Sequence, residues 1–351
     1  LNITDSIKSF NKGYKQLIIG ISKKSNLFRK SGSVKIISIK LISQSLPVFL
    51  GYIRYLLIFT EFNLRVLYEC IKFNPHTVHC HDLIGLYIGI ILKYTYKTKF
   101  IFDAHELEAQ DSFVSPSEHV LRTIYEFLPV LICDNLITVS NSIALWYKWK
   151  GAKKITVILN KPNNINTYKY NYIKNYPPKQ DGINLLYIGA LEKYRSIEIL
   201  LASFKGLKGY NLYFLGEGSL EEKIRSQISI YGNIYLHPFV PKDNIVNFIE
   251  GFDYSICLIE PSSLSDYFCL PNKLYQSLAA GIPVISSNIP ELANYISINR
   301  YGFVVNNVEN IVQSIENYSE HKYETIKKII EDKNYFLWES ENSKLREVYN
   351  F

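Results

Sequence analysis

Residues 268–287 read FCLPNKLYQSLAAGIPVISS and combine a loop, a short helix and a buried strand. Pro271 suits the first position of a helix, where its missing N–H costs nothing, and Gly281 suits the position just past a helix end. The apolar run after Gly281 has the composition of a central parallel strand. Asn272 and Lys273 lie in the first turn, where backbone N–H groups, the positive end of the helix dipole and a cation converge. The stretch therefore predicts a phosphate site.

Apolar strands alternate with amphipathic helices along the chain, which is typical of parallel sheets covered by helices. The expected strands are 16–21, 77–79, 99–102, 135–139, 155–158, 184–188, 211–215, 234–236, 254–258, 283–286 and 303–305. The expected helices are 4–15, 59–71, 83–94, 121–131, 142–149, 197–204, 220–231, 244–251, 274–280, 289–295 and 308–317. We therefore expect an α/β fold of two Rossmann-like, doubly wound domains facing a cleft, with ligands bound at the carboxyl ends of the strands.

The domain boundaries follow from composition. Segment 163–180 is rich in Asn, Tyr and Pro without periodicity, and it predicts a linker between domains 1–162 and 181–330. The first domain begins with a helix before its first strand, so we expect it to lack an opening strand. With 351 residues, 47% hydrophobic and 20% charged, the chain is long and apolar enough for two cores.

Cysteine usage and charge bear on the compartment. The five cysteines are scattered, without disulfide or zinc-site spacing, and no signal peptide is visible, which together favour a cytoplasmic protein. Residues 1–160 contain 20 Lys or Arg and 11 Asp or Glu, whereas the rest contains 19 and 21. The basic first half fits either contact with an anionic membrane surface or ordinary solvation. The apolar stretch 46–59 is too short to span a bilayer and contains Arg54; a buried helix is favoured there and peripheral attachment is left open.

Four features of the second domain follow the ends of successive expected strands. They are Gly189 with Arg195, Gly216 of a Gly-Glu-Gly turn, the pair Phe239 and Val240, and the turn from Leu270 to Gln276. Together they predict a nucleotide-diphosphate site. Arg195 and Lys273 are expected to bind the phosphates. Phe239 and Val240 are expected to hold a flat ring, and Gln276 to bond ribose hydroxyls.

Two polar clusters follow strands of the first domain, HCHD at 79–82 and DAHE at 103–106. His81, Asp82 and His105 are expected to line the cleft and bond hydroxyl-rich substrates, with Asp103 or Glu106 orienting His105 or acting as a base. His79 is expected to have a structural role. A metal site is disfavoured, because we expect His79 and His81 to point to opposite faces and metal ligands come in convergent groups. Motifs of serine nucleophiles, Walker loops and dinucleotide loops are absent from the sequence.

These residues resemble the retaining glycosyltransferases of family 4, which have the GT-B fold. The similarity extends over nearly the whole chain and rests on HCHDLIGLYIG (79–89), FDAHELEAQ (102–110), DNLITVSNSIA (134–144), VILNKP (157–162), LLYIGALEKYRSIEILLASF (185–204), LPNKLYQSLAAGIPVISSNIPEL (270–292) and FLWESENSKLREVY (336–349). It implies an acceptor-side first domain, a donor-binding second domain, and a terminal helix in 331–351 that packs back on the first domain.

The resemblance implies transfer of a hexose from a UDP- or GDP-sugar to a saccharide with retention of configuration, without a metal, a cofactor or a nucleic-acid partner. A lipid-linked acceptor of surface polysaccharide assembly (capsule or lipopolysaccharide) suits the basic first half. By position, His105 matches the family's histidine that contacts the donor sugar, and Arg195 its phosphate-binding residue, whose usual companion is here Ala190.

The family often carries two glutamates separated by seven residues, and Phe268 and Gln276 occupy those places here. Glu260 or Asp266 are candidates to replace the first acid. The missing acids also motivate an alternative, a non-catalytic GT-B subunit that supports an active transferase. A nucleotide-sugar epimerase fits the 270–281 pattern less well.

Overall fold

The structure, a computed structural model, describes residues 2–22, 25–47, 51–111, 115–163, 180–193, 195–317 and 320–351. Contacts divide the chain into two compact units. Unit 1 comprises Leu1–Val139, Ile143–Ile158 and Asn342–Phe351, and unit 2 comprises Ser140–Ser142 and Leu159–Glu341. The linker expected at 163–180 lies almost entirely outside the described residues. All five cysteines are free thiols.

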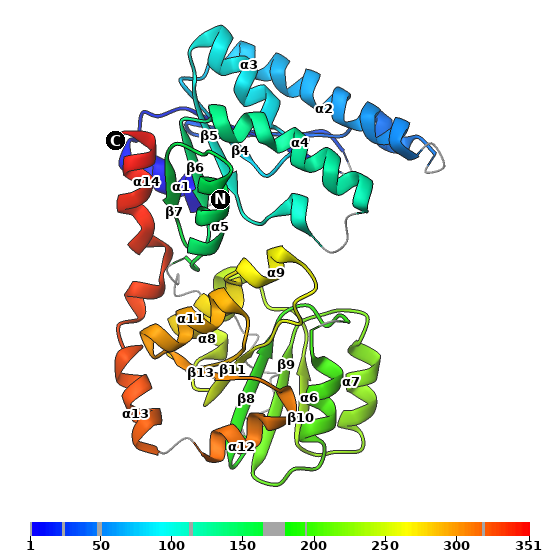
Figure 1. Ribbon diagram of the computed structural model, residues 1–351, viewed down its shortest axis with the longest axis vertical. Coiled ribbons are helices and arrows are strands. Elements are labelled where there is room, and N and C mark those ends of the chain that lie inside the picture. The colour runs from blue at the N-terminus through cyan, green and yellow to red at the C-terminus, as the bar shows by residue number, and fades with distance from the viewer. Residues whose placement is uncertain are drawn as a thin grey trace. The chain divides into compact units, whose positions relative to one another are not determined.

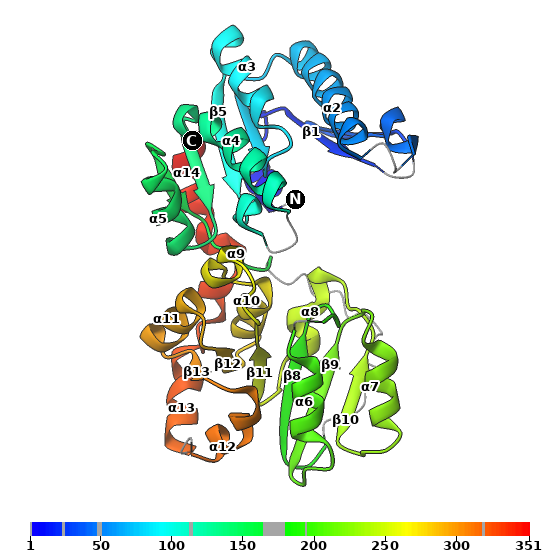
Figure 2. The same ribbon diagram turned by 45° about the vertical axis from the view of Figure 1, so that its right-hand side comes forward.

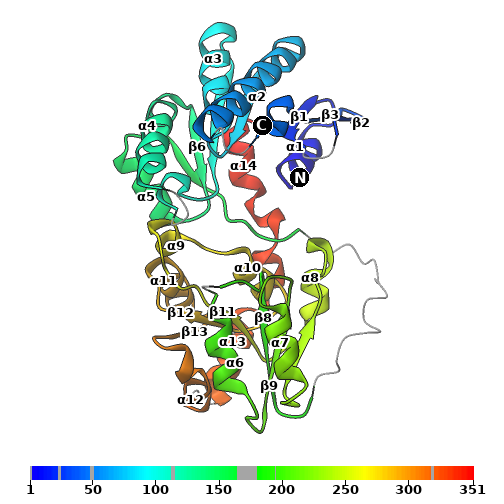
Figure 3. The ribbon, with the colours of Figure 1, turned by 90° about the vertical axis from the view of Figure 1, so that its right-hand side faces the viewer.

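Two sheets of hydrogen-bonded strands are described in unit 1. The first has the order β1-β3-β2, with β1 (Gln16–Ile21) parallel and β2 (Leu27–Ser31) antiparallel to β3 (Val34–Ile39). Figure 3 shows these strands beside α1 (Asn2–Phe10). The sequence analysis predicted neither β2 nor β3. The residues of β2, LFRKS, are exposed along their whole length and lack an apolar alternation.

The second sheet of unit 1 is parallel, in the order β4-β5-β6-β7. Its strands are β4 (Thr77–His81), β5 (Lys99–Ala104), β6 (Asn135–Thr138) and β7 (Ile155–Val157). The helices of this part are η1 (Ile42–Ser45), α2 (Gly51–Phe73), α3 (Leu86–Tyr96), η3 (Glu108–Gln110), α4 (Pro116–Ile132) and α5 (Asn141–Trp149). Parallel pairing aligns the carboxyl ends of β4 and β5, and this places the two polar clusters at one edge of the sheet.

The expectation of a buried helix in 46–59 is wrong for the part that the structure describes. Helix α2 begins at Gly51, and Ile53, Tyr55 and Leu56 on its first two turns are each 63% exposed. An apolar composition alone does not fix burial, because packing partners must also be present. None of the helices in the described ranges is long and apolar enough to cross a membrane.

The end of the chain belongs to unit 1. After η6 (Lys333–Phe336) and η7 (Trp338–Glu341), α14 (Asn342–Tyr349) lies beside α1 (Figure 1). The Ser6 hydroxyl donates to Asn342 Oδ1 at 2.7 Å, and the Phe10 and Phe351 rings meet edge to face at 5.8 Å. Within the expected segment 331–351, only α14 is α-helical, because two 3-10 turns precede it.

Unit 2 is built on one parallel sheet in the order β10-β9-β8-β11-β12-β13, and Figure 2 labels its strands side by side in this order. Its strands are β8 (Ile183–Ile188), β9 (Tyr210–Leu215), β10 (Ile234–His237), β11 (Tyr254–Cys257), β12 (Val284–Ser287) and β13 (Gly302–Val305). Its helices are α6 (Ile197–Phe204), α7 (Glu221–Ile228), α8 (Lys242–Ile249), α9 (Leu264–Phe268), α10 (Asn272–Ala279), α11 (Pro290–Asn299), η5 (Val308–Asn310), α12 (Ile311–Glu316) and α13 (Glu320–Ile329). All six strands agree with the sequence prediction within one residue at each end.

Helices cover both faces of this sheet. Along β8, Leu186 and Ile188 pack with α8, α10 and α11, whereas Leu185 and Tyr187 pack with α6, α7 and α12. Pro271 is the residue before α10 and not its first residue as predicted, with φ −73° and ψ 150°. Gly281 follows the helix end with φ +71°, a conformation that favours glycine, as predicted.

Candidate functional site

The topology of unit 2 marks the place for a ligand. Strand β8 lies between β9 and β11, so the chain leaves β8 toward β9 and β10 and later returns to the opposite side as β11. Ligands of open parallel sheets bind beside the carboxyl ends of the strands at such a switch point. The loops that follow β8, β9, β10 and β11 therefore form the candidate donor edge, and they contain most of the predicted second-domain residues.

Glycines bring the first two of these loops together. Gly216, with φ +155°, approaches Gly189 so closely that a Cβ on it would lie 1.9 Å from Gly189 O. The Gly189 N–H donates to Leu215 O at 3.0 Å, and the Leu191 N–H donates to Glu217 O at 2.9 Å. This close approach explains physically why glycine occupies position 216.

Two cations stand at the candidate donor edge. Lys273 Nζ donates to Leu258 O at 3.0 Å and lies 4.9 Å from the centre of the Tyr187 ring, a cation–π contact. Burial lowers the pKa of Lys273, and the positive charge of Arg195 acts in the same direction. Arg195 is exposed, whereas Lys273 is part-buried. The pair repels, and a bound anion between the two charges would relieve that repulsion.

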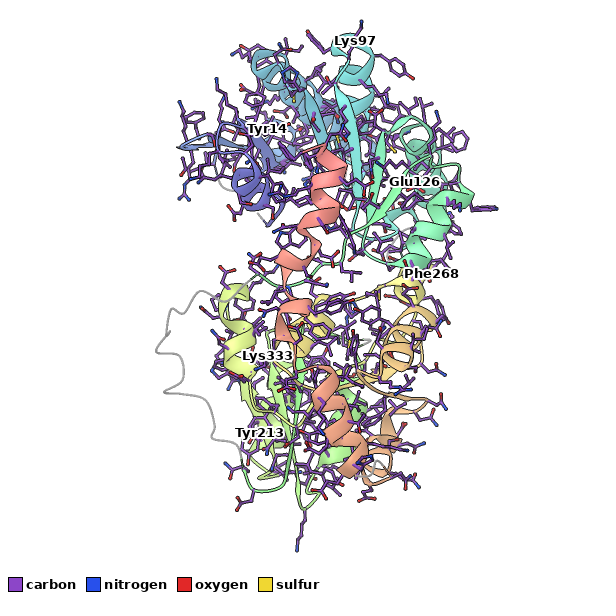
Figure 4. All side chains as sticks on the ribbon, turned by 90° about the vertical axis from the view of Figure 1, so that its left-hand side faces the viewer. Tyr14, Lys97, Glu126, Tyr213, Phe268 and Lys333 are labelled. Carbon is purple, nitrogen blue, oxygen red and sulfur yellow. The ribbon has the colours of Figure 1, made fainter. Side chains whose placement is uncertain are left out.

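The acids considered as replacements for the missing glutamates have different surroundings. Asp266 Oδ2 accepts the N–H and hydroxyl of both Ser262 and Ser263, so this carboxylate caps α9. Glu260 Oε1 accepts the Ser196 N–H at 2.7 Å, directly before α6. Phe268 is the last residue of α9, where Figure 4 labels it.

The remaining predicted residues of unit 2 are placed unequally. Phe239 is 57% exposed, whereas Val240 is only 2% exposed and packs in the core. Of the two residues, Phe239 is therefore the one whose side chain can contact a flat ring. Leu270 is likewise buried in that core. Asn272 is exposed at the start of α10, and Gln276 is part-buried one turn later.

In unit 1, one carboxylate oxygen gathers three imidazole rings. Asp103 Oδ2 lies 3.0 Å from His79 Nε2, 3.1 Å from His81 Nδ1 and 3.4 Å from His105 Nε2. The last two nitrogens are themselves 3.1 Å apart. On its other side, His79 Nδ1 lies 2.5 Å from the Tyr349 hydroxyl of α14. We call Asp103, His79, His81 and His105 the histidine cluster.

This arrangement corrects the expectation that His79 and His81 face opposite ways. Their rings stack with centres 4.4 Å apart, because side chains two residues apart share one face of a strand. Asp103 and not Glu106 holds His105, and Glu106 is exposed. The sequence analysis also missed Tyr349, since no local pattern links this residue to β4.

The electrostatics of the histidine cluster follow from burial and hydrogen bonding. Burial opposes ionisation of Asp103, but hydrogen bonds from the three histidines hold the pKa of its carboxyl well below the usual range. The hydrogen bond to Asp103 raises the pKa of His105 to about 9, although burial opposes this. Burial lowers the pKa of His79 despite the same carboxylate. The contact between His105 and Asp103 therefore favours the protonated form of the imidazole and the ionised form of the carboxyl.

Known proteins resemble both the sequence and the fold. Residues 182–321 match the family model described as "Glycosyl transferases group 1". A stretch of 220 residues is 26% identical to an uncharacterized glycosyltransferase of Haemophilus influenzae, and this match covers 60% of the chain and 59% of that protein. The chain therefore spans less than two thirds of this relative.

Two solved structures show the fold. Sucrose-phosphate synthase from Thermosynechococcus elongatus aligns with a TM-score of 0.72 at 15% identity, over 99% of this chain and 91% of that one. Anabaena HepE in complex with UDP-glucose aligns with a TM-score of 0.65 at 12% identity, over 96% and 100%. The chain therefore has the fold of GT-B glycosyltransferases, as the sequence motifs predicted, and its residues 182–321 are similar to the group 1 glycosyl transferases.

Proposed function

We propose that the protein is a retaining glycosyltransferase that moves a hexose from a UDP- or GDP-sugar to a saccharide acceptor. The observation that carries the proposal is the placement of two cations, Arg195 and Lys273, beside the switch point of the sheet, within the residues that match the group 1 glycosyl transferase model. A nucleoside diphosphate has the negative charge that two such cations bind. Anabaena HepE, which has a similar fold and was solved in complex with UDP-glucose, supports this class of donor.

The residues of unit 2 stabilise the charge that develops on the leaving diphosphate. As the glycosidic bond breaks, negative charge grows on the diphosphate oxygen, and that oxygen accepts the proton of the attacking hydroxyl. Lys273, Arg195 and the backbone N–H groups at the start of α10 stabilise this charge without a metal and without an enzymic nucleophile. The Lys273 ammonium is already held by Leu258 O, so little reorganisation accompanies the reaction.

Other groups orient the donor. The exposed ring of Phe239 is available for the base, and Gln276 for the ribose. Glu260 is the better substitute for the missing first acid, because its Oε1 accepts one N–H, whereas Asp266 is used to cap α9. In unit 1, the part-exposed His105 donates to hydroxyls of the transferred sugar, and Asp103 fixes its ring. His81 and Asp82, at the end of β4, serve the acceptor.

We propose a lipid-linked acceptor and contact with an anionic membrane. The support is a row of exposed apolar side chains on α4, spaced as one helix face: Val120, Leu121, Ile124, Phe127 and Leu128. Residues 1–160 add a basic charge balance. Sedimentation with vesicles tests the contact; a chain that stays in solution with anionic vesicles would refute it.

The catalytic proposal is tested with Lys273→Ala and Arg195→Ala, and with Lys208→Ala as an exposed control. Removing one donor to a developing charge costs about 3 kcal/mol, roughly a hundredfold in rate. We expect each site variant to lose turnover of its nucleotide sugar by that order and to weaken UDP or GDP binding in calorimetry, whereas the control keeps both. Wild-type turnover in either site variant would refute the assignment.

One second candidate is a non-catalytic GT-B subunit of an active transferase. It is favoured by Phe268 and Gln276, which stand where the family often carries two glutamates. Calorimetry with UDP, GDP and CMP separates the two functions, because a scaffold of this kind binds none of these nucleotides.

A further inference from the structure

The histidine cluster of unit 1 has a second chemical use that the donor reaction does not require. Among the described residues, His79, His81 and Asp103 are a group whose ligand atoms all lie within 4.8 Å of one another. His105 Nε2 adds a fourth such atom, 3.1 Å from His81 Nδ1 and 3.4 Å from Asp103 Oδ2. Neutral imidazole nitrogens and a carboxylate are the ligands that Zn²⁺ prefers after thiolates.

The geometry points to a zinc site whose three protein ligands are His81 Nδ1, His105 Nε2 and Asp103 Oδ2. These atoms form a triangle with sides of 3.1, 3.1 and 3.4 Å. A tetrahedral Zn²⁺ with bonds of about 2.0–2.1 Å holds its ligand atoms about 3.3–3.4 Å apart. A Zn²⁺ ion thus fits the triangle with shifts of a few tenths of an ångström.

The hydrogen bonding of the cluster also favours a cation. A carboxylate oxygen offers about two lone-pair directions, yet three ring nitrogens lie within 3.4 Å of Asp103 Oδ2. A metal bound to His81, His105 and Asp103 would leave only the His79 hydrogen bond on that oxygen. Asp82 and Glu106 add negative charge around His105.

His79 then has the role of an outer hydrogen-bond partner. It contacts Asp103 Oδ2 at 3.0 Å through Nε2 and the Tyr349 hydroxyl at 2.5 Å through Nδ1, so both ring nitrogens are engaged. Partners of this kind orient a ligating carboxylate. The open side of the site is formed by His81 and His105, whose side chains are 52% and 38% exposed, and this leaves the fourth position to water.

The zinc site has a consequence for activity, which rests on the proposed function. Zn²⁺ on His105 Nε2 replaces the contact with Asp103 that orients this ring toward the sugar, so Zn²⁺ inhibits transfer and takes no part in it. Binding itself does not depend on this consequence.

The test uses the full chain after dialysis against a chelator. Titration with Co²⁺, followed by its visible absorption, reports tetrahedral coordination, and competition with a chromophoric chelator gives the Zn²⁺ affinity. We expect one equivalent to bind the wild type. We expect His81→Ala and His105→Ala to lose the tetrahedral spectrum, and His79→Gln to weaken binding by about 10–100-fold. His321→Ala, an exposed histidine of unit 2, is the matched control and should leave binding unchanged.

Three results would overturn the assignment. One is a wild-type chain that does not bind Zn²⁺ or Co²⁺. Another is a double variant, His81→Ala with His105→Ala, that is folded by circular dichroism and keeps wild-type affinity. The third is binding that survives His105→Ala but not His79→Gln, which would move the ligand set to His79, His81 and Asp103. If Zn²⁺ binds as expected but does not inhibit transfer, the sugar contact of His105 fails and the zinc site stands.

Discussion

The buried ion pair of Lys161 and Glu341 in unit 2 allows a sharp prediction about stability. Lys161 Nζ lies 2.7 Å from Glu341 Oε1, and both side chains are only 2% exposed. Lys161 also donates to Tyr335 O and Ser340 Oγ, each at 2.8 Å. The Glu341→Gln substitution keeps the shape of the side chain but leaves the ammonium group without its anionic partner.

The expected cost follows from this environment. Removing one partner of a buried pair costs about 3–5 kcal/mol. Because two uncharged acceptors stay on Lys161, we expect the lower end, about 3 kcal/mol in the free energy of unfolding. Replacing both residues with apolar ones of similar size, Lys161→Met with Glu341→Leu, should recover most of this loss, since no unpaired charge is then buried.

The assay is urea unfolding followed by tryptophan fluorescence. The chain has three tryptophans, and Trp146→Phe with Trp149→Phe leaves the buried Trp338, three residues before Glu341, as the reporter. The wild type, Lys161→Met, Glu341→Leu and their double variant form a double-mutant cycle within this background, and Glu341→Gln is measured beside it. A Glu341→Gln cost below about 1 kcal/mol, or additive effects in the double variant, would show that the pair is not coupled as the distances imply.

Two further predictions concern a glycine and an acid. Gly216→Ala places a Cβ 1.9 Å from Gly189 O at a φ of +155°, so we expect lower thermal stability and weaker nucleotide binding in calorimetry; unchanged values for both would contradict the close approach. Burial raises the pKa of Glu61, but hydrogen bonds from the Ser43 hydroxyl and from the N–H groups of Ser43 and Ile42 outweigh it and lower the pKa below 4.5. The charged form therefore stabilises the fold above the unfolded pKa, and this contribution is lost as the pH falls through the folded pKa. Glu61→Gln should cost about 1–2 kcal/mol at pH 7 in urea unfolding, with a difference from wild type that shrinks below pH 4.5; a constant difference would refute the role of the charge.

The sheet of unit 2 could be predicted because its signals are local. Each of its strands is a short apolar run, and turn residues such as Gly189 and Gly281 mark the ends of neighbouring elements. The exposed strand β2 and the start of α2 could not be predicted in the same way. The exposure of these two segments depends on whether other parts of the chain pack against them, and the periodicity of the sequence does not contain that information.

The candidate site also has a part that local sequence patterns predicted and a part that they did not. The sequence identified Arg195 and Lys273 as cations near the ends of strands, because their positions follow from the strand assignment. It did not reveal that Lys273 lies over the Tyr187 ring. Nor did it reveal that Asp103 gathers three histidines with Tyr349 behind them, since these contacts join residues up to 270 positions apart.

The two glutamates that the family often carries at positions 268 and 276 are not required for the main catalytic task, stabilisation of the leaving diphosphate. The step that limits glycosyl transfer without a nucleophile is departure of a diphosphate, and cations rather than acids stabilise that charge. Both cations are present, and one of them, Lys273, is held in place by Leu258 O and the Tyr187 ring.

An acid at position 268 would act on the sugar and not on the diphosphate. Loss of that acid should therefore change which sugar is accepted more than it changes whether transfer occurs, and Phe268→Glu should alter donor preference while leaving nucleotide binding intact. If the wild type and Phe268→Glu show the same preference among nucleotide sugars, this division of roles is refuted.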